Sequence, residues 1–591
     1  MFKKKPKFPL PDLGGRSLGE MILEIEKRGL MGHFKESFLF SSFNPKGEGI
    51  SVTRDYWIMA GIDPASSYKH YLETEKKIIS SVDESLAYLK KVIDSLTLKI
   101  HGLVKSTNSD YFLRKLIALF NVTYDIYIRD RQSREILVEK NWNSPHNTYE
   151  RNRNITLTIL NGLNLIIENS ILFQNDEDND ENKDKDCFDK LVDVDLLVDI
   201  YLYALASQYY TLLNVSKNSK NYKYCSGIII SPDEDIPIEG IITHPLVYTN
   251  TMLSGNIDAL LPNDEQEYLK SANSSEIGKG FKELYGIEFL EMMNCVYSLK
   301  RNLCEKDKKL AITISETQLK NYLLHWYPNV NIKAFLKYFV MDKRMLEPYV
   351  TEKEPFIYKM GSNKNRLEIR PIIKLENGSI YTSYALLDRA MNLWYSYIIN
   401  GGRPYTGVEP GKGDTLIDGC SRHEKELGDQ TVNILFALLE KNFPEAAFKD
   451  TDVKYDKIFG KRDEDYGDFD IIYYVGNELY LIESKYFSDS YTGNTIIGDY
   501  NKLFAQKNNY YKHCRGRYDL VISKPNVFKE YIGATGDINV HFLFVSSKAL
   551  EVEFQDEDKI VTILSIANFE RYLNGKLLYE DGAVLRPTYK L

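Results

Sequence analysis

Acidic and basic side chains converge in the short segment between Gly467 and Lys485. Asp468 and Asp470 open one apolar run, and Glu483 and Lys485 close the next. Carboxylate oxygens are ligands that suit the hard divalent cations Mg²⁺ and Mn²⁺. A lysine beside such an ion can orient or stabilise an attacking hydroxide. These residue types therefore predict a divalent-cation site with hydrolytic chemistry.

A β-hairpin is the element that would bring these side chains together. β-Branched and aromatic residues flank Gly476–Asn477, a dipeptide suited to a tight two-residue turn. A turn centred there places Asp470 opposite Glu483, and alternation of side chains adds Lys485 and Asp468 to the same face. Opposed like charges are destabilising, so a compensating cation is expected. The alternative, an edge hairpin with a solvated charged face, is less consistent with acids embedded among Ile, Leu and Tyr.

The spacing of these residues resembles a known nuclease pattern. Asp470, followed on the next strand by Glu483-Ser484-Lys485, is similar to the PD-(D/E)XK nuclease superfamily, and Gly467-Asp-Phe-Asp470 resembles the entry to that motif in many members. Gln506-Lys-Asn-Asn-Tyr510 matches the QxxxY element of the RecB-type branch. The resemblance covers residues 411–591.

The resemblance implies a role for each matching residue. Asp470 and Glu483 would bind Mg²⁺ or Mn²⁺, and Lys485 would position or stabilise the hydroxide that attacks the scissile phosphate. Gln506 and Tyr510, expected on one face of a helix from Asp499 to Arg517, would orient the metal site or the DNA backbone.

The superfamily usually places one more acid on its first helix. Ser421 begins a capping-box pattern, which predicts a helix from there to about Lys441. Extending the apolar face of this helix towards its start reaches Asp429 as the candidate metal ligand. Glu424 is the alternative, and His423 is a third candidate.

Basic residues are concentrated on the helix expected to carry Gln506. The net charge of the chain is −9, so any nucleic acid must bind a local patch. A solvated helix face is the other reading, but proximity to the acids favours phosphate contacts. The candidate nucleic-acid-binding residues are Lys502, Lys507, Lys512, Arg515 and Arg517.

Cofactors other than a divalent metal are not expected. The six cysteines are scattered, and only Cys514 follows the hairpin, so no iron–sulfur cluster is predicted and reduced thiols indicate a cytoplasmic protein. Gly411–Lys412 matches part of the phosphate-loop motif. Gly413 stands where that motif requires Ser or Thr, so no nucleotide is expected. The apolar stretches 155–173 and 192–215 are interrupted by polar residues, so no membrane span is predicted.

The fold class predicted is α/β, with a restriction-endonuclease-like mixed sheet flanked by helices at the C-terminus. Residues 1–345 form a mainly helical region, with an acidic, disordered loop at 175–186. Apolar residues at three- and four-residue spacing from Leu86 to Ile100 predict one of its helices, and others are expected at Ser275–Leu303 and Thr317–Trp326, the last with Ser315 as a candidate cap. Residues 346–410 form a hairpin, a helix and a Gly-rich linker, and residues 411–591 form the nuclease-like domain.

The function expected is a metal-dependent nuclease that hydrolyses phosphodiester bonds of DNA. By analogy, its setting is bacterial anti-phage defence or restriction. The alternatives are a nuclease directed at RNA, and a non-catalytic nucleic-acid-binding or scaffold protein with a relic nuclease core. A protein partner or a homo-oligomer is left open, and residues 1–400 carry no motif that assigns them a role.

Overall fold

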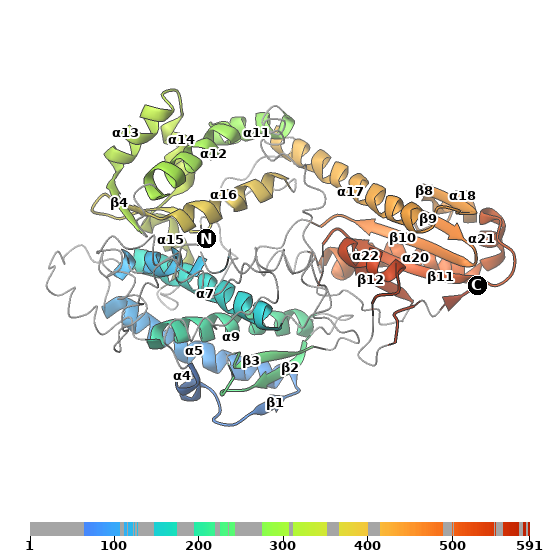
Figure 1. The fold of residues 1–591 in the computed structure, drawn as a ribbon, viewed down its shortest axis with the longest axis horizontal. Coiled ribbons are helices and arrows are strands. Elements are labelled where there is room, and N and C mark those ends of the chain that lie inside the picture. Colours follow the sequence, from blue (N-terminus) through green and yellow to red (C-terminus); the bar gives the residue numbers. More distant parts are fainter. Residues whose placement is uncertain are drawn as a thin grey trace, which may run out of the picture.

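The computed structural model arranges the chain as a mixed α/β structure with three sheets in the part described (Figure 1). The expected acidic loop at 175–186 and the linker at 401–413 lie outside that part. The described residues are 64–106, 112–127, 147–173, 194–218, 225–242, 275–305, 311–351, 366–399, 414–487, 499–550, 560–577 and 583–591, with short gaps in several ranges.

The N-terminal body consists of helices packed on a small antiparallel sheet. Apolar residues at three- and four-residue spacing bury one face of α5 against α9, as the periodicity predicts. The sheet, in the order β1-β2-β3, was not expected from the sequence. The elements are α4 (Pro64–Tyr71), β1 (Lys77–Ile79), α5 (Val82–Ser106), α7 (Asn147–Leu172), α9 (Val194–Asn218), β2 (Cys225–Ile230) and β3 (Ile238–Ile242).

Helix α7 contains an apolar stretch long enough to cross a membrane. This stretch runs from Ile155 to Leu172, and 89% of it is buried inside the protein. The buried positions include polar residues as well, among them Asn164, Glu168 and Asn169. It is the single helix of that length and composition among the residues described.

The central body surrounds a four-stranded sheet in the order β4-β7-β6-β5. One helix from Ser275 to Leu303 was predicted, but Gly286 adopts φ +71° and ends α11, so the prediction was wrong. Ser315 caps α13 in a capping box with Gln318, as expected. The elements are α11 (Glu276–Tyr285), α12 (Phe289–Ser298), η3 (Leu299–Glu305), β4 (Ile312–Ser315), α13 (Glu316–Trp326), α14 (Ile332–Phe339), β5 (Val340–Met341), α15 (Lys343–Leu346), η4 (Glu347–Tyr349), β6 (Ile372–Lys374), β7 (Ser379–Thr382) and α16 (Tyr384–Ile399).

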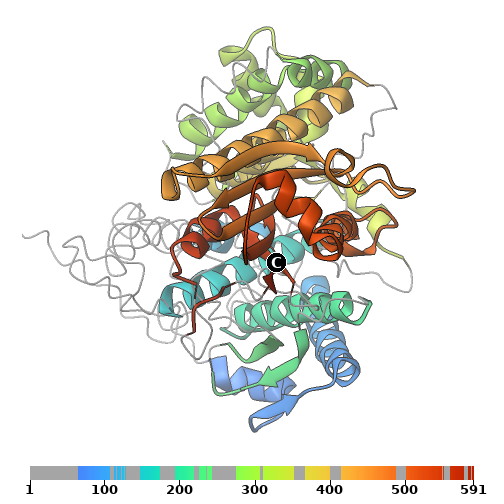
Figure 2. The same ribbon diagram turned by 90° about the vertical axis from the view of Figure 1, so that its right-hand side faces the viewer.

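The C-terminal body is a mixed sheet in the order β12-β11-β10-β9-β8, with β13 also paired to β11. Strands β8, β9 and β10 are antiparallel neighbours, whereas β10, β11 and β12 run parallel. Figure 2 views the molecule from this side. The elements are α17 (Thr415–Asn442), β8 (Phe448–Lys454), α18 (Tyr455–Phe459), β9 (Asp468–Val475), β10 (Glu478–Lys485), η5 (Asn501–Ala505), α20 (Tyr510–Ser523), α21 (Pro525–Ile532), β11 (Asn539–Ser546), β12 (Val561–Ser565), α22 (Ile566–Leu573) and β13 (Tyr589–Lys590).

Helices cover both faces of this sheet. Alternate residues of β10 explain how: Leu479 and Leu481 pack towards α20 and α21, whereas Tyr480 and Ile482 pack towards α17 and α22. Because the period is two, Glu483 falls on the same side as Leu481, the side of α20. The sheet therefore presents the charged end of β10 to α20.

Helix α17 belongs to two cores at once (Figure 1). Its first turns bury Leu416 and Cys420 in the central core, and its later turns bury Leu435 and Leu439 against the C-terminal sheet. The helix begins at Thr415 with Asp414 as its N-cap, so the start predicted at Ser421 was wrong. The helix thus enters the central body before it reaches the sheet.

Candidate active site

The hairpin forms in the predicted register. β10 pairs with β9 from Glu478 opposite Val475 to Ile482 opposite Ile471, and Gly476 adopts φ +61° in the turn. The next opposed positions are Asp470 and Glu483. The turn dipeptide therefore fixes the relative position of the two acids.

Asp470, Glu483 and Lys485 contact one another. Lys485 Nζ lies 2.6 Å from Glu483 Oε1 and 3.3 Å from Asp470 Oδ2. The side chain of Glu483 is 4% exposed and that of Asp470 is 15% exposed, so both charges are largely removed from water. Asp470 Oδ2 also accepts a 2.6 Å hydrogen bond from the backbone N–H of Ser484. One ammonium group thus bridges the two carboxylates.

Arg517 closes the other side of Glu483. Its guanidinium, on α20, pairs with Glu483 Oε2 and donates to the carbonyl oxygen of Tyr466. The side chain is 3% exposed and lies 5.7 Å from the centre of the Phe469 ring. Burial lowers the pKa of Arg517, while nearby phenolic and carboxylate groups oppose that effect. The proposal that Arg517 belongs to an exposed nucleic-acid-binding face was wrong.

Asp452 is a further acid at the site, and no feature of the sequence singled it out. Thr451 pairs with Ile471 and Val453 pairs with Phe469, so Asp452 lies opposite Asp470 on β8. It adopts φ +52°, the only positive φ of a non-glycine residue among those described. Asp tolerates that conformation better than most residues, which is a weak signal that the sequence did contain.

The carboxyl group of Asp452 is surrounded by like charge. Partial desolvation raises its pKa, and the charges of Asp470, Asp429 and Asp468 raise it further, while Lys485 acts in the opposite direction. Because these Coulombic effects fall with distance, Asp452 on β8 lies near Asp468 and Asp470 on β9 and Asp429 on α17.

Of the candidates on the first helix, Asp429 is the one that the structure brings to this cluster. Asp429 contributes to the raised pKa of Asp452. Glu424 lies more than one turn earlier on α17, and His423 lies 3.4 Å from Glu426; Glu424 and Asp429 are both exposed. Asp429 is therefore the better placed of the three candidates.

The helix predicted to carry Gln506 and Tyr510 on one face does not form. The segment forms only the short helix η5, which ends at Ala505, and Gln506 lies exposed in the turn that follows. Asn509 starts a new helix, because its side chain accepts from the N–H of Lys512. Tyr510 is still beside the site, since Lys485 Nζ lies 5.8 Å from the centre of its ring.

The other basic residues of this segment are only partly available to a ligand. Lys512 pairs with Glu464, and Arg515 pairs with Asp519 at 2.9 Å. Lys507 is exposed in the turn, and Lys502 is half-buried. Phosphate contacts by these four residues remain a prediction.

The acids and cations of the site determine whether it can hold a divalent metal. Among the residues described, no three His, Cys, Asp or Glu side chains stand close enough together to hold an ion as they are. Lys485 and Arg517 pair with the two oxygens of Glu483. The ammonium within reach of both carboxylates shows that they can hold one cation between them, and oxygen donors suit Mg²⁺ or Mn²⁺. The chemistry of the two carboxylates therefore suits a divalent metal, with Lys485 as the cation that they share in this structure.

A second polar network lies at the opposite end of β10. His541 Nδ1 is 2.7 Å from the hydroxyl of Tyr572, and its Nε2 is 2.8 Å from Glu478 Oε2. The ring stacks on Tyr480 with 4.1 Å between centres. Burial lowers the pKa of His541, although Glu478 partly offsets this. The network joins β10, β11 and α22 in the folded state.

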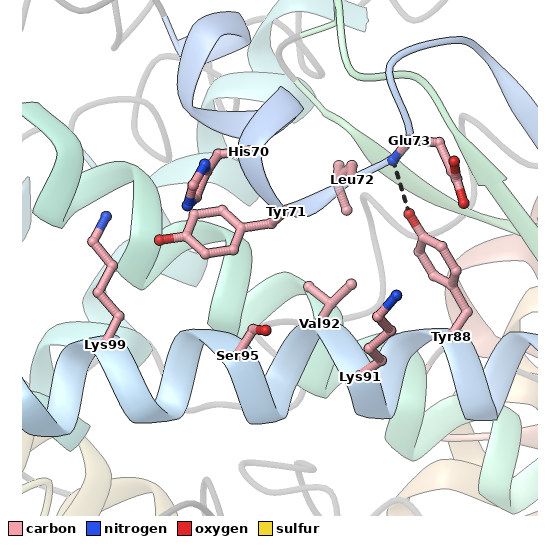
Figure 3. A pocket seen from close by; sticks show the side chains of 9 residues that line it. All are labelled: His70, Tyr71, Leu72, Glu73, Tyr88, Lys91, Val92, Ser95 and Lys99. Atoms are coloured by element: carbon pink, nitrogen blue, oxygen red, sulfur yellow. Dashed lines mark hydrogen bonds between the residues drawn. The ribbon is translucent and has the colours of Figure 1, made fainter.

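A separate cavity of about 540 Å³ opens between α5 and the end of α4. Figure 3 shows Lys99, Ser95 and Lys91 along α5, on the side of the helix that faces His70, Tyr71 and Leu72. The charge of Lys99 is balanced by the buried Asp199 at 2.7 Å. The cavity thus has neither the shared ammonium nor the acid cluster of the hairpin site.

Comparison of the chain with protein-family models, curated proteins and solved structures returned no match. The functional argument therefore rests on the geometry of the hairpin site.

Proposed function

We propose that the chain is a metal-dependent nuclease that hydrolyses phosphodiester bonds of DNA. The observation that carries the proposal is the position of Lys485 Nζ, within 3.3 Å of Asp470 and 2.6 Å of Glu483. A hydrolytic metal site needs ligands such as carboxylates to hold the ion, and a cation beside the incoming nucleophile can stabilise it. These three side chains provide both.

The order of elements around the site supports the proposal. Helix α17 precedes an antiparallel meander, β8-β9-β10, and α20 then leads to β11, which runs parallel to β10. A mixed sheet with helices on both faces in this order is what the resemblance to restriction-endonuclease-like cores implies. Asp470 and Glu483 lie on the second and third strands of this meander.

The charge of the cluster favours a divalent cation. Asp429, Asp452, Asp468, Asp470 and Glu483 provide five carboxylates, and two cations of the chain, Lys485 and Arg517, contact Asp470 and Glu483. Such a cluster repels a phosphodiester unless a cation lies between them. The net charge therefore argues for metal-assisted binding of the substrate.

The residues would act in distinct ways. Asp470 and Glu483, with Asp429 or Asp452, would hold Mg²⁺ or Mn²⁺, which when bound polarises a phosphoryl oxygen and lowers the pKa of bound water. The Lys485 ammonium would stabilise the incoming hydroxide. The ring of Tyr510, 5.8 Å from Lys485 Nζ, limits where that ammonium can move. Arg517 would keep one oxygen of Glu483 away from solvent.

A cleavage assay tests the proposal. The full chain would be incubated with linear, circular and single-stranded DNA, and with RNA, in Mg²⁺, Mn²⁺ or EDTA. Metal-dependent cleavage that is lost in Lys485→Ala supports the nuclease. Cleavage that survives in Lys485→Ala at the parental rate removes this site from the reaction, and the choice of substrate separates DNA from RNA.

One observation favours a second candidate, a non-catalytic nucleic-acid-binding protein. Both oxygens of Glu483 are already paired with cations of the chain itself, as in a structural ion-pair network. Under this alternative the parent binds nucleic acid without cleaving it, and Asp470→Asn leaves that binding unchanged. The same assay, run with a binding measurement, distinguishes the two functions.

A further inference from the structure

Arg517 contacts both the end of β10 and the segment just before β9. Its guanidinium contacts Glu483 Oε2 at the end of β10 and the carbonyl oxygen of Tyr466, just before β9 begins. The two strands that it joins carry Glu483 and Asp470. One planar side chain therefore spans both halves of the acid pair.

The backbone packs closely around the guanidinium of Arg517 at Gly467 and Gly516. Gly467 adopts φ +75°, and a Cβ on it would lie 3.2 Å from a guanidinium nitrogen of Arg517. A Cβ on Gly516, the residue before Arg517, would lie 2.3 Å from the ring of Tyr466. Only glycine allows α20 and the Tyr466–Gly467 segment to approach so closely. The contact between them is therefore built into the fold.

The contact with Arg517 fixes the orientation of the Glu483 carboxylate. Arg517 holds Oε2 on the α20 side, so Oε1 faces Lys485 and, through it, Asp470. A Glu side chain alone has several rotamers, and a group that fixes one oxygen selects among them. Residues that orient a metal ligand in this way commonly change metal affinity about 10- to 100-fold when replaced.

We propose that Arg517 is a positioning residue that presents Glu483 and the start of β9 to the metal. This inference rests on the proposed function, because it assigns Arg517 a role towards the ion that Asp470 and Glu483 would hold. Lys cannot replace it, because a single ammonium group cannot reproduce the fork that reaches Glu483 and Tyr466 together.

The test is titration of the metal-stripped full chain with Mn²⁺ by calorimetry, together with the Mn²⁺ dependence of cleavage. Arg517→Lys should weaken Mn²⁺ binding about 10- to 100-fold and raise the Mn²⁺ midpoint of cleavage equally. Turnover at saturating Mn²⁺ should fall much less. Gly516→Ala keeps Arg517 but places a Cβ against the ring of Tyr466, so it should weaken binding in the same direction.

Arg366→Lys is the matched control. Arg366 forms a buried pair with Glu168, 2.6 Å apart, outside the C-terminal body. Its replacement should lower the melting temperature and leave the Mn²⁺ affinity at the parental value. Mn²⁺ binding by Arg517→Lys that is unchanged or tighter overturns the inference. If that variant does not fold, the Gly516→Ala titration decides in the same way.

The failures of the two proposals can be told apart. A parent chain that neither binds Mn²⁺ nor cleaves any substrate overturns the nuclease, and the role of Arg517 with it. A parent that does both, beside an Arg517→Lys variant with parental affinity, overturns the role of Arg517 alone.

Discussion

The backbone N–H of Ser484 donates a 2.6 Å hydrogen bond to Oδ2 of Asp470. Asp470 is therefore an acceptor that ties β9 to β10 as well as a charge facing Glu483. The repulsion expected between the two carboxylates is offset, because Lys485 contacts both and Arg517 contacts Glu483. Removing one of the acids should thus disturb a balanced set of charges.

Asp470→Asn should melt at a lower temperature than the parent in EDTA. The amide oxygen can still accept from Ser484, but the ion pair with Lys485 is lost, at a cost of about 1 kcal/mol in the free energy of unfolding. The variant should also lose metal-dependent cleavage and most of the stabilisation by Mn²⁺, because a ligand that binds only the folded state stabilises it. Melting curves with and without Mn²⁺ measure both effects. An equal or higher melting temperature in EDTA would show that repulsion between the acids dominates.

Lys485→Met should reduce cleavage by at least about 100-fold, as loss of a group that stabilises developing charge commonly does. In EDTA its melting temperature should fall, because the two carboxylates lose the ammonium that they share. Added Mn²⁺ should raise that temperature by more than it does in the parent. Lys441→Met removes an exposed pair with Glu570, 2.8 Å apart, and should leave all three quantities near the parental values.

Gly280→Val should destabilise the whole chain by about 1–3 kcal/mol, as overpacking does. A Cβ at Gly280 would lie 2.2 Å from the backbone nitrogen of Leu416, so α11 and α17 must separate. Gly102→Ala, in an open part of α5, should be neutral or stabilising. Urea unfolding of the two variants measures the difference. Equal stability would mean that the crossing of α11 and α17 tolerates a side chain.

The stability of the chain should fall as the pH drops below about 6.5, and His541 should account for part of that fall. Burial lowers the pKa of His541 in the folded state, so on acidification the unfolded state takes up the proton first. The groups facing the ring are Glu478, Tyr480, Tyr572 and Arg586, and burial outweighs the opposing effect of Glu478.

The measurement is the free energy of unfolding between pH 5 and pH 8. His541→Gln should flatten the profile in this window and lower the stability at pH 8, because the contacts with Glu478 and Tyr572 change. The exposed His325, replaced by Gln, should leave the profile as it is in the parent. A profile unchanged by His541→Gln would place the titration elsewhere.

The hairpin could be predicted because its signals are local. Gly476–Asn477 sets the turn, the turn sets the register, and the register sets which acids meet. The end of α11 carried a similar signal in Gly286, and the start of α20 carried one in Asn509, whose side chain caps the helix. Both signals were missed because the apolar spacing continues on either side of these residues and predicts one uninterrupted helix.

Arg517 and Asp452 could not be recognised in the same way. Arg517 stands among several basic residues, and burial against Glu483 follows from the packing of α20 on the sheet. Asp452 lies on a mostly exposed edge strand, and its place opposite Asp470 depends on pairing between β8 and β9. Tertiary contacts, which local propensity does not encode, decide both positions.

Helix α17 connects the central body to the acid cluster. Thirteen residues separate Leu416, seated in the central core, from Asp429, a span of roughly 20 Å at 1.5 Å per residue. A tilt of about 3° at the crossing with α11 would therefore shift Asp429 by about 1 Å at the far end. Shifts of that size are enough to change a reaction rate about 100-fold. A change in the tilt of the central body relative to the C-terminal sheet would thus be transmitted along α17 to Asp429.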